Sequence, residues 1–495
     1  MNKRKIDFEL EDGDCFPGKT YVDELLKPVF KDQRDYLFDA MFMIHRAHTI
    51  MLKEQQIISV VEAKKILDGI NQVASMERKL LNYMPEYEDL FFLVEAEIAK
   101  LIGHDLAGKM HIARSRNDMG EAMYRIVLRD HILELLDNVQ KLGQSLVPQA
   151  KDHVHTIMPA HTHTQPAQPT TFGHYLLAIS DNLSRDVDRL WQAYYTVNRS
   201  PMGAAAITTT GFPISRERMV ELLGFNDMME NSYDAIGTGD YLLETALTLV
   251  SVMTNIGRWI QELLRMASNE VGLLKVSDAY VQVSSIMPQK RNPVSLEHSR
   301  ALASSAVGEG LSVVQMIHNT PYGDIVDTED DLQPHLYNGF HKANRVIKLL
   351  TAVMTTMKFD KERALQQAKT NMITITELAD VLARDYDVPF RKAHQLSSFV
   401  SKKATEVKKE LYEVTTDEVN EWIGDVKLSE EDWKNICDPK TFVERRSVTG
   451  GPNPEVVGSM VKDRKVKWGN VEEMVETFSY KVQFVKENLR NEILR

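Results

Sequence analysis

Residues 284–293 carry the densest set of chemically reactive side chains in the sequence, with two serines, a lysine, an arginine and an asparagine. The segment follows neither the period of strands nor that of helices, which predicts a loop. It ends in Asn292-Pro293. Because asparagine favours the N-cap and proline the first helical turn, we expect a helix to begin there. A cationic loop that enters the positive end of a helix is suited to holding an anion, although a solvated surface connection is the alternative.

Two other polar segments lead into predicted helices. In the first, Ser115 and Asp118 have the spacing of a capping box, and a helix is expected from about residue 119 to 147. The second covers residues 159–169, where three prolines exclude a helix, so its polar groups are predicted to project from an irregular loop before a helix begins near Thr170. Three donor-rich loops therefore each lead to a helix N-terminus.

These segments resemble the signatures of the fumarase/aspartase superfamily. Residues 284–293 contain its paired serines, Met-Pro, Lys and Asn-Pro in register. The Arg-Ser-Arg-Asn-Asp run at 114–118 and the Thr-His-Thr-Gln-Pro-Ala-Gln-Pro run at 162–169 resemble the argininosuccinate lyase branch, and the resemblance extends over nearly the whole chain beyond about residue 20. It implies an all-α fold of three mostly helical domains, with a central bundle of long helices. It also implies a homotetramer with a shared helical core.

The resemblance implies a carbon–nitrogen lyase of arginine biosynthesis that splits argininosuccinate into arginine and fumarate by β-elimination. It assigns the general base to Ser284 and proton transfer to His163, which Glu297 would orient. Lys290 would stabilise the negative charge that develops on the carbanion. Since a free serine is far too weak a base, Ser284 would need backbone amides, Lys290 and a closed, dry site to stabilise its alkoxide.

The family's substrate-binding positions are also present, and Arg116 suits a bidentate grip on a carboxylate. By resemblance, the binding residues are Ser115, Arg116, Asn117, Thr162, Gln165, Ser285, Asn292, Tyr322 and Gln333. The alternatives are a solvated charge for Arg116 and for Arg114, and an exposed lysine beside a helix cap for Lys290.

A metal site built from histidines is a rival interpretation of the second segment. Its ligands would be His153, His155, His161 and His163. It lacks a nearby cysteine or carboxylate, and the His-x-His spacing does not place both rings on one helix face. We therefore predict no metal. We also predict no organic cofactor, because a carbanion stabilised by a carboxylate needs no electron sink.

Several positions depart from the family pattern. Phe91 stands where a histidine is expected, Gly239 replaces an arginine, and Pro334-His335 alters a third motif, while the usual Trp-Gly-Gly-Arg-Phe start is missing. The groups expected to contact the succinyl half are intact, whereas those near the distal half are changed. An acidic run before the third motif could bind the guanidinium; it contains Asp327, Glu329, Asp330 and Asp331.

These departures leave three functional hypotheses. The first is an argininosuccinate lyase. The second is a related lyase that releases fumarate from another N-substituted aspartate, of the aminopolycarboxylate type. The third is a non-catalytic structural protein of the same fold, which the intact catalytic positions disfavour. A small dicarboxylate is the expected substrate class in the first two.

Bulk properties exclude some classes of partner. The chain has 495 residues, a net charge of −12 and two cysteines. The acidic balance argues against nucleic acid, and the sequence has no apolar run of membrane length. The basic start at residues 1–5 is followed by acidic residues where a signal peptide needs apolar ones. We therefore expect a cytoplasmic protein without disulfide bonds.

Long helical patterns are expected to position the three loops. Apolar residues indicate helices at 241–266, after Pro293, and at 335–357. We place an N-terminal helical domain at residues 1–114, a central bundle and oligomerisation domain at 115–365, and a small helical domain at 366–495. The resemblance implies that each active site collects its three segments from three subunits. The apolar 241–266 helix fits burial in such an assembly, but a core within one chain explains it equally well.

Overall fold

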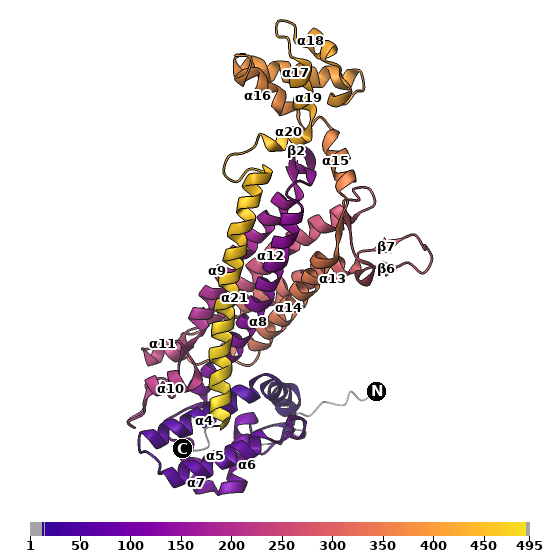
Figure 1. Cartoon of the computed structure of the whole chain (residues 1–495). Helices are drawn as coiled ribbons and strands as arrows, with labels where there is room; N and C mark the ends of the chain where they lie inside the picture. The colour runs from indigo at the N-terminus through magenta and orange to yellow at the C-terminus, as the bar shows by residue number, and fades with distance from the viewer. Residues whose placement is uncertain (1–11, 14, 492–495) are drawn as a thin grey trace, which may run out of the picture.

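The computed structural model describes residues 12–13 and 15–491, so the basic start of the chain lies outside the described residues. The described part is mostly helical, which confirms the all-α class (Figure 1). The first half contains the helices α2 (Lys19–Tyr21), α3 (Lys27–Asp32), α4 (Phe38–Glu54), α5 (Val60–Ala74), α6 (Leu90–Ile102), α7 (His104–Lys109), α8 (Arg116–Asp152), α9 (Phe172–Val197), α10 (Arg216–Leu223), α11 (Ser232–Gly237) and α12 (Asp240–Ala267). The second half contains α13 (Val294–Ile317), α14 (Gln333–Thr356), α15 (Lys361–Lys369), α16 (Ile375–Arg384), α17 (Phe390–Glu406), α18 (Thr416–Ile423), α19 (Glu430–Cys437), α20 (Pro439–Glu444) and α21 (Pro454–Asn491).

The remaining elements are short. The π-helical and 3-10 segments are η1 (Val22–Leu26), η2 (Gln33–Leu37), η3 (Arg78–Leu80), η4 (Asp278–Tyr280), η5 (Val326–Thr328) and η6 (Leu411–Glu413). The strands are β1 (Ile157–Thr162), β2 (Gln165–Thr171), β3 (Arg199–Ser200), β4 (Asp227–Met228), β5 (Leu274–Lys275), β6 (Gln282–Val283), β7 (Arg291–Asn292) and β8 (Lys358–Phe359). They form two-stranded ribbons that pair β1 with β2, β3 with β4, β5 with β8 and β6 with β7.

Long helices form the centre of the molecule, where α8, α9, α12, α13 and α14 run alongside one another (Figure 1). Helix α12 shows why they bundle: its fully buried residues recur every three or four positions, namely Leu242, Ala246, Leu249, Val252, Ile256 and Ile260. The predicted helix at 241–266 is confirmed as α12. The helices expected after Pro293 and from residue 335 are confirmed as α13 and α14.

The last long helix, α21, returns along this bundle and packs against α8 and α9. Trp468 of α21 is buried there and donates from Nε1 to the Ser180 hydroxyl at 2.8 Å. A Cβ atom on Gly143 of α8 would lie only 2.3 Å from the Trp468 ring, so glycine is required where the two helices meet. The N-terminal helices α2–α7 cover the lower end of the bundle, where α21 ends.

A separate hydrophobic core lies at the upper end of the molecule. It is built from residues between Leu378 and Ile436 on α16–α19, and Trp433 is buried within it. The Glu377 carboxylate, also buried, accepts hydrogen bonds from Arg445, at 2.6 Å, and from Arg446, which ties α16 to the segment after α20. The three domain ranges stay predictions, and α21 packs with the central bundle rather than with this second core.

The prediction of an irregular loop at residues 159–169 is wrong, because the structure has the antiparallel hairpin β1–β2 there. Pro159 and Pro169 lie opposite each other, and the pairing shifts at Ala160 and His161. Both strands of a two-stranded ribbon are edge strands. Proline is tolerated in such strands, whereas in an inner strand its missing N–H would remove a ladder hydrogen bond. The helix expected near Thr170 is confirmed as α9, which begins at Phe172.

The predicted capping role of Asn292 is also wrong. Asn292 pairs with Gln282 in the ribbon β6–β7, and Pro293 occupies the N-cap of α13 without a side-chain cap. The backbone pairing of β7 therefore holds Asn292 in an extended conformation outside the helix. By contrast, the capping box of Ser115 and Asp118 is confirmed at the start of α8.

Candidate active site

The segment 115–117 is held rigidly at the start of α8 by the buried carboxylate of Asp118. Its Oδ1 accepts from the Ser115 backbone N–H, and its Oδ2 accepts from the N–H groups of Gly203 and Ala205, each at 3.0 Å. Burial raises the pKa of Asp118 to about 6, although the three amide donors act in the opposite direction. The start of α8 is thereby fixed to the 203–205 loop. From the sequence, only a capping role was expected for Asp118.

Two carboxylates contact the guanidinium of Arg116. Its Nη1 lies 3.0 Å from Asp89 Oδ2 and 3.7 Å from Glu88 Oε2, and the guanidinium lies 4.7 Å from the centre of the Phe92 ring. About half of the side chain stays exposed. Arg116 is therefore oriented by its neighbours yet accessible to a ligand.

A cavity of about 310 Å³ opens beside Arg116 and Asn117. Phe91, one of the departures from the family pattern, lines it between the rings of His45 and His111. Acidic side chains dominate its polar wall: Glu88, Asp89, Glu121, Asp324, Glu329, Asp330 and Asp331. Burial together with Asp324 and Asp330 raises the pKa of Glu329, because these carboxylates repel one another. The cavity would favour a cationic group next to the arginine.

Glu121 provides a pH-dependent prediction. Burial raises the pKa of this carboxyl from 4.5 to about 8, so the folded chain keeps a proton that the unfolded chain loses. A raised carboxyl pKa means that stability falls as pH rises through the window from 4.5 to 8. Glu121→Gln imitates the neutral acid. We expect the variant to be more stable than the parent by about 4 kcal/mol at pH 8, at ~1.36 kcal/mol per pKa unit, and by about 1 kcal/mol at pH 5.

Denaturant unfolding of both proteins at the two pH values measures this difference. Glu476→Gln, which removes an exposed carboxylate from α21, is the matched control and should change stability little at either pH. Equal stability of Glu121→Gln and the parent at pH 8 would contradict the inferred protonation of Glu121.

His163 lies at the tip of the hairpin β1–β2. The strands close at Thr162 and Gln165, leaving His163 and Thr164 as a two-residue loop with φ values of +51° and +63°. Left-handed conformations at two residues other than glycine are unfavourable, and turns of this kind usually select glycine or asparagine. His163 is exposed at this strained tip. Thr162 and Gln165 are exposed beside it.

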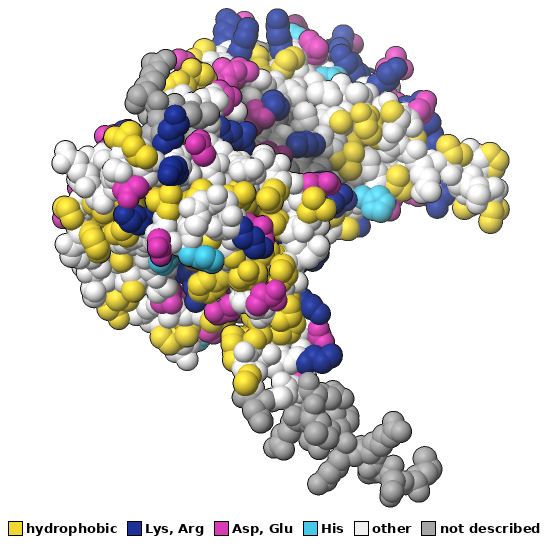
Figure 2. Space-filling model, turned by 90° about the horizontal axis from the view of Figure 1, so that it is seen from below, with side chains coloured by type: hydrophobic (Ala, Val, Ile, Leu, Met, Phe, Trp, Pro, Cys, Tyr) yellow, Lys and Arg dark blue, Asp and Glu magenta, His cyan; other side chains and the backbone are white. Residues whose placement is uncertain are grey.

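Ser284 lies at the base of the loop that joins β6 to β7. Its Oγ accepts from the backbone N–H groups of Ile286, at 3.3 Å, and Met287, at 3.0 Å. Two amide donors directed at one hydroxyl oxygen stabilise its deprotonated form. Ser285 and Lys290 are exposed on the same loop. The loop projects from the body of the molecule with hydrophobic side chains at its end, as Figure 2 shows; Val283, Ile286 and Met287 are among its exposed residues.

The other predicted site residues lie in different surroundings. Glu297 is exposed in the first turn of α13. Tyr322 donates to Asp234 Oδ1 at 2.5 Å and is mostly exposed. Gln333 is buried, donates to the Thr328 carbonyl at 3.2 Å and accepts from the Tyr337 hydroxyl at 3.2 Å, so its amide is already engaged. The altered His335 contacts Glu309 at 2.6 Å, and Pro334 occupies the first turn of α14.

The three loops do not meet within one chain. Helix α8 has 37 residues, and at about 1.5 Å per residue it places Arg116 roughly 55 Å from the end that leads into β1. Helix α13 has 24 residues and separates the Ser284 loop from the Arg116 end by roughly 36 Å. Figure 1 shows the same separation, with β2 above, β6 and β7 at the side, and the start of α8 below. Within one chain, therefore, the three predicted segments lie far apart.

Neither a metal-binding cluster nor a membrane-spanning helix is found among the described residues. Among residues 12–13 and 15–491, no three histidine, cysteine or acidic side chains are grouped so that they could hold a metal ion. Within the same part of the chain, none of the helices combines the length and apolar character needed to cross a bilayer.

Known protein families match this chain in two regions. Residues 30–308 match the Lyase family, and residues 372–444 match the Argininosuccinate lyase C-terminal family. The chain is 40% identical over 449 residues to argininosuccinate lyase 2 of Agrobacterium fabrum, covering 89% of this chain and 88% of that protein. The chain belongs to the argininosuccinate lyase family. An argininosuccinate lyase of Methanocaldococcus jannaschii is 36% identical, covering 92% of this chain and 93% of the relative.

Solved structures confirm the fold of this family member. An EDDS lyase in complex with formate superimposes with a TM-score of 0.84 at 32% identity, covering 94% of this chain and 95% of that one. A variant of EDDS lyase with bound fumarate gives the same values. A fumarate lyase from Mesorhizobium sp. BNC1, at 17% identity, shares the fold with a TM-score of 0.70, covering 88% of this chain and 97% of that one.

Proposed function

We propose that this chain cleaves argininosuccinate to arginine and fumarate by β-elimination. The observation that carries the proposal is the Ser284 hydroxyl, whose oxygen accepts two backbone hydrogen bonds on a loop that also bears Lys290. Such an oxygen can act as a base once the loop is closed against water. Membership of the argininosuccinate lyase family supports the same reaction.

In the proposed reaction, Ser284 Oγ removes a proton from the carbon next to a carboxylate. The electron pair moves into that carboxylate, and Lys290 stabilises the charge. The C–N bond then breaks, the carbon skeleton leaves as fumarate, and the departing guanidine receives a proton. We assign proton transfer to His163, with Glu297 to orient its ring. Arg116, Ser115 and Asn117 would hold a substrate carboxylate at the start of α8; the remaining proposed contacts are Thr162, Gln165, Ser285, Asn292, Tyr322 and Gln333.

The acidic cavity beside Arg116 supports a cationic leaving half. A guanidinium would pair with carboxylates such as Glu88, Glu329 and Asp330, and it would relieve the repulsion among them. Arginine carries such a cation, which favours argininosuccinate over N-substituted aspartates whose leaving half is neutral or acidic. This assignment rests on the pocket that the structure forms around the Arg116 segment.

We further propose that the active site forms in a homotetramer, where the three loops come from three different protomers. The separation of these loops within one chain supports this arrangement, because each loop has an exposed side chain and no single loop carries all of the proposed catalytic and binding groups. Exposed leucines on the central helices, Leu247 of α12 and Leu311 of α13, are available for contact with another copy. A cytoplasmic location stays a prediction.

A lyase for another N-substituted aspartate is the second candidate, favoured by the close fit to EDDS lyase. Fumarate release, followed by ultraviolet absorbance, separates the two candidates when argininosuccinate, EDDS and other N-substituted aspartates are compared. We expect argininosuccinate to have a kcat/KM at least about a hundredfold above the others, a difference of ~2.8 kcal/mol in transition-state binding. Turnover of EDDS without turnover of argininosuccinate would contradict the first candidate, and no turnover of any compound would contradict both.

A further inference from the structure

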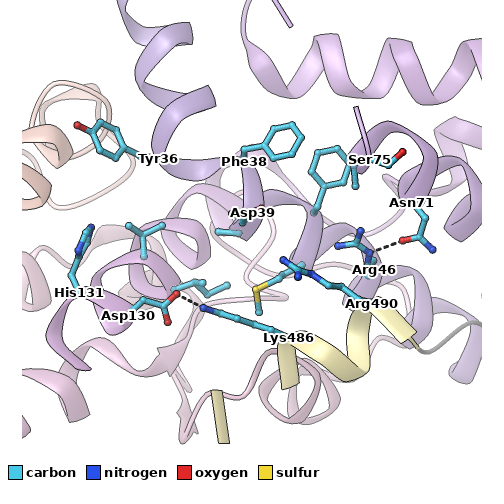
Figure 3. A pocket seen from close by; sticks show the side chains of 16 residues that line it. Tyr36, Phe38, Asp39, Arg46, Asn71, Ser75, Asp130, His131, Lys486 and Arg490 are labelled. Atoms are coloured by element: carbon cyan, nitrogen blue, oxygen red, sulfur yellow. Dashed lines mark hydrogen bonds and ion pairs between the residues drawn. The ribbon is translucent and has the colours of Figure 1, made fainter. Parts of the chain in front are cut away.

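A second cavity, of about 470 Å³, lies away from the three polar loops. It is lined by the N-terminal helices α4 and α5, the middle of α8 and the end of α21 (Figure 3). Its residue Asp130 follows Arg116 by 14 positions on α8, which is roughly 20 Å along the helix. Its volume is in the range of small-molecule binding sites, and nothing in the proposed reaction uses it.

Three cationic side chains reach this cavity: Arg46 from α4, and Lys486 and Arg490 from α21 (Figure 3). Lys486 is neutralised by Asp130 at 2.5 Å. Asp39, the other acidic residue of the lining, pairs with Arg78. Within the described part of the chain, no carboxylate lies within ion-pair distance of Arg46 or Arg490, so the cavity has an excess of positive charge.

Arg46 is the strongest indication of a built site, because its side chain is only 7% exposed. Its Nε donates to Asn71 Oδ1 at 2.8 Å, which fixes the plane of the guanidinium and leaves its two terminal nitrogens free to face the cavity. Burial, together with the charge of Arg490, lowers the pKa of Arg46 to about 10. Two guanidinium groups of like charge are thus held near one space without a shared anion, an arrangement that an incoming anion would stabilise.

The phenylalanines of the lining offer a ligand almost no surface. Phe38 and Phe42 share one face of α4 with Arg46, their rings lie 4.7 Å apart, and the two residues are only 3% and 1% exposed. The Arg46 guanidinium lies 5.9 Å from the centre of the Phe42 ring, so the packed rings hold the arginine side chain in place. The cavity therefore offers a ligand mainly the charge and the hydrogen-bond donors of its arginines.

We propose that this cavity binds a small oxyanion, a phosphate or carboxylate group, either free or carried by a small molecule. The oxyanion lies between Arg46 and Arg490. Because Arg46 belongs to the N-terminal helices and Arg490 to the end of α21, the bound ligand joins these two elements. Binding therefore stabilises their contact and raises the melting temperature of the full chain.

Titration calorimetry on the full-length protein tests this proposal with inorganic phosphate and acetate as probes. We expect at least one of the two to bind at the cavity once per chain, because both arginines can donate hydrogen bonds to its oxygen atoms. Comparison of the two probes identifies the preferred oxyanion.

Two variants locate the site. Arg490→Gln removes an exposed charge at the end of α21 and should weaken binding about tenfold, whereas Arg46→Gln should weaken it by about a hundredfold. Lys467→Gln, which removes an exposed charge from the same helix outside the cavity, should leave the affinity unchanged. The rise in melting temperature should disappear in Arg490→Gln and persist in Lys467→Gln.

Two results would overturn the proposal: no binding of phosphate or acetate by the parent protein, or an Arg490→Gln affinity equal to that of the parent. Arg490→Gln keeps the test decisive even if Arg46→Gln, which loses the bond to Asn71, fails to fold. Because every measurement is of binding, the outcome is independent of whether argininosuccinate is the substrate.

Discussion

Replacing Ser284 by alanine is expected to reduce the rate of fumarate release by about a thousandfold while substrate affinity changes no more than a few fold. General base catalysis contributes about 10²–10⁴ to rate, and the two amide donors at Ser284 Oγ bind the charged form of this oxygen more strongly than the neutral hydroxyl. Alanine leaves the rest of the loop and its cationic Lys290 unchanged. The loss should therefore fall on kcat.

Single-turnover measurement of fumarate gives the rate, and titration of the inactive variant with argininosuccinate gives the affinity. Ser312→Ala is the matched control, because Ser312 is a half-buried serine of α13 whose hydroxyl donates to the Gly308 carbonyl of the same helix. If the Ser284 variant lost affinity in proportion to rate, Ser284 would be a binding residue and the proposed base would have to be another group.

Arg116→Gln is expected to reduce kcat/KM by about a hundredfold, mainly by raising KM. A charge-assisted bidentate bond to a carboxylate contributes about 1.5–3 kcal/mol, and it forms in the ground state as well as in the transition state. The variant also leaves Asp89 without its partner at 3.0 Å, which adds repulsion in an acidic cavity. The prediction is measured by steady-state kinetics with argininosuccinate.

Arg199→Gln is the control for this substitution, since Arg199 forms an exposed ion pair with Asp227 at 3.0 Å away from the cavity. Its kinetics should match those of the parent protein. An Arg116→Gln enzyme with an unchanged KM would show that Arg116 serves only to orient the helices around Glu88 and Asp89.

Much of the helical architecture could be predicted from local chemistry. Apolar spacing located α12, α13 and α14, and the Ser115–Asp118 capping box located the start of α8, because these signals depend on neighbouring residues within a few turns. The fold class and family also followed from ordered motifs that are local in sequence. Such features need no knowledge of distant contacts.

The features that sequence reasoning missed depend on partners far along the chain. Asp118 is tied to Gly203 and Ala205, which no local pattern connects with it. The hairpin β1–β2 forms although it contains three prolines, because a two-stranded ribbon has only edges. Asn292 does not cap α13, because it pairs with Gln282 in the ribbon β6–β7. The second cavity brings together Arg46 and Arg490, separated by 444 positions, and only the folded chain places them at one wall.

The central claim, an active site that needs loops from different protomers, is tested most directly by mixing two defective proteins. Ser284→Ala and Arg116→Gln chains, carrying different tags, are co-expressed, and mixed assemblies are purified through both tags. Each variant alone passes through the same procedure as a control. If Ser284 and Arg116 of one site come from different chains, random mixing leaves both intact in about one quarter of the sites of a symmetric tetramer. The mixed protein should then reach about one quarter of the parent kcat/KM. Activity no higher than the average of the two variants would contradict the shared site.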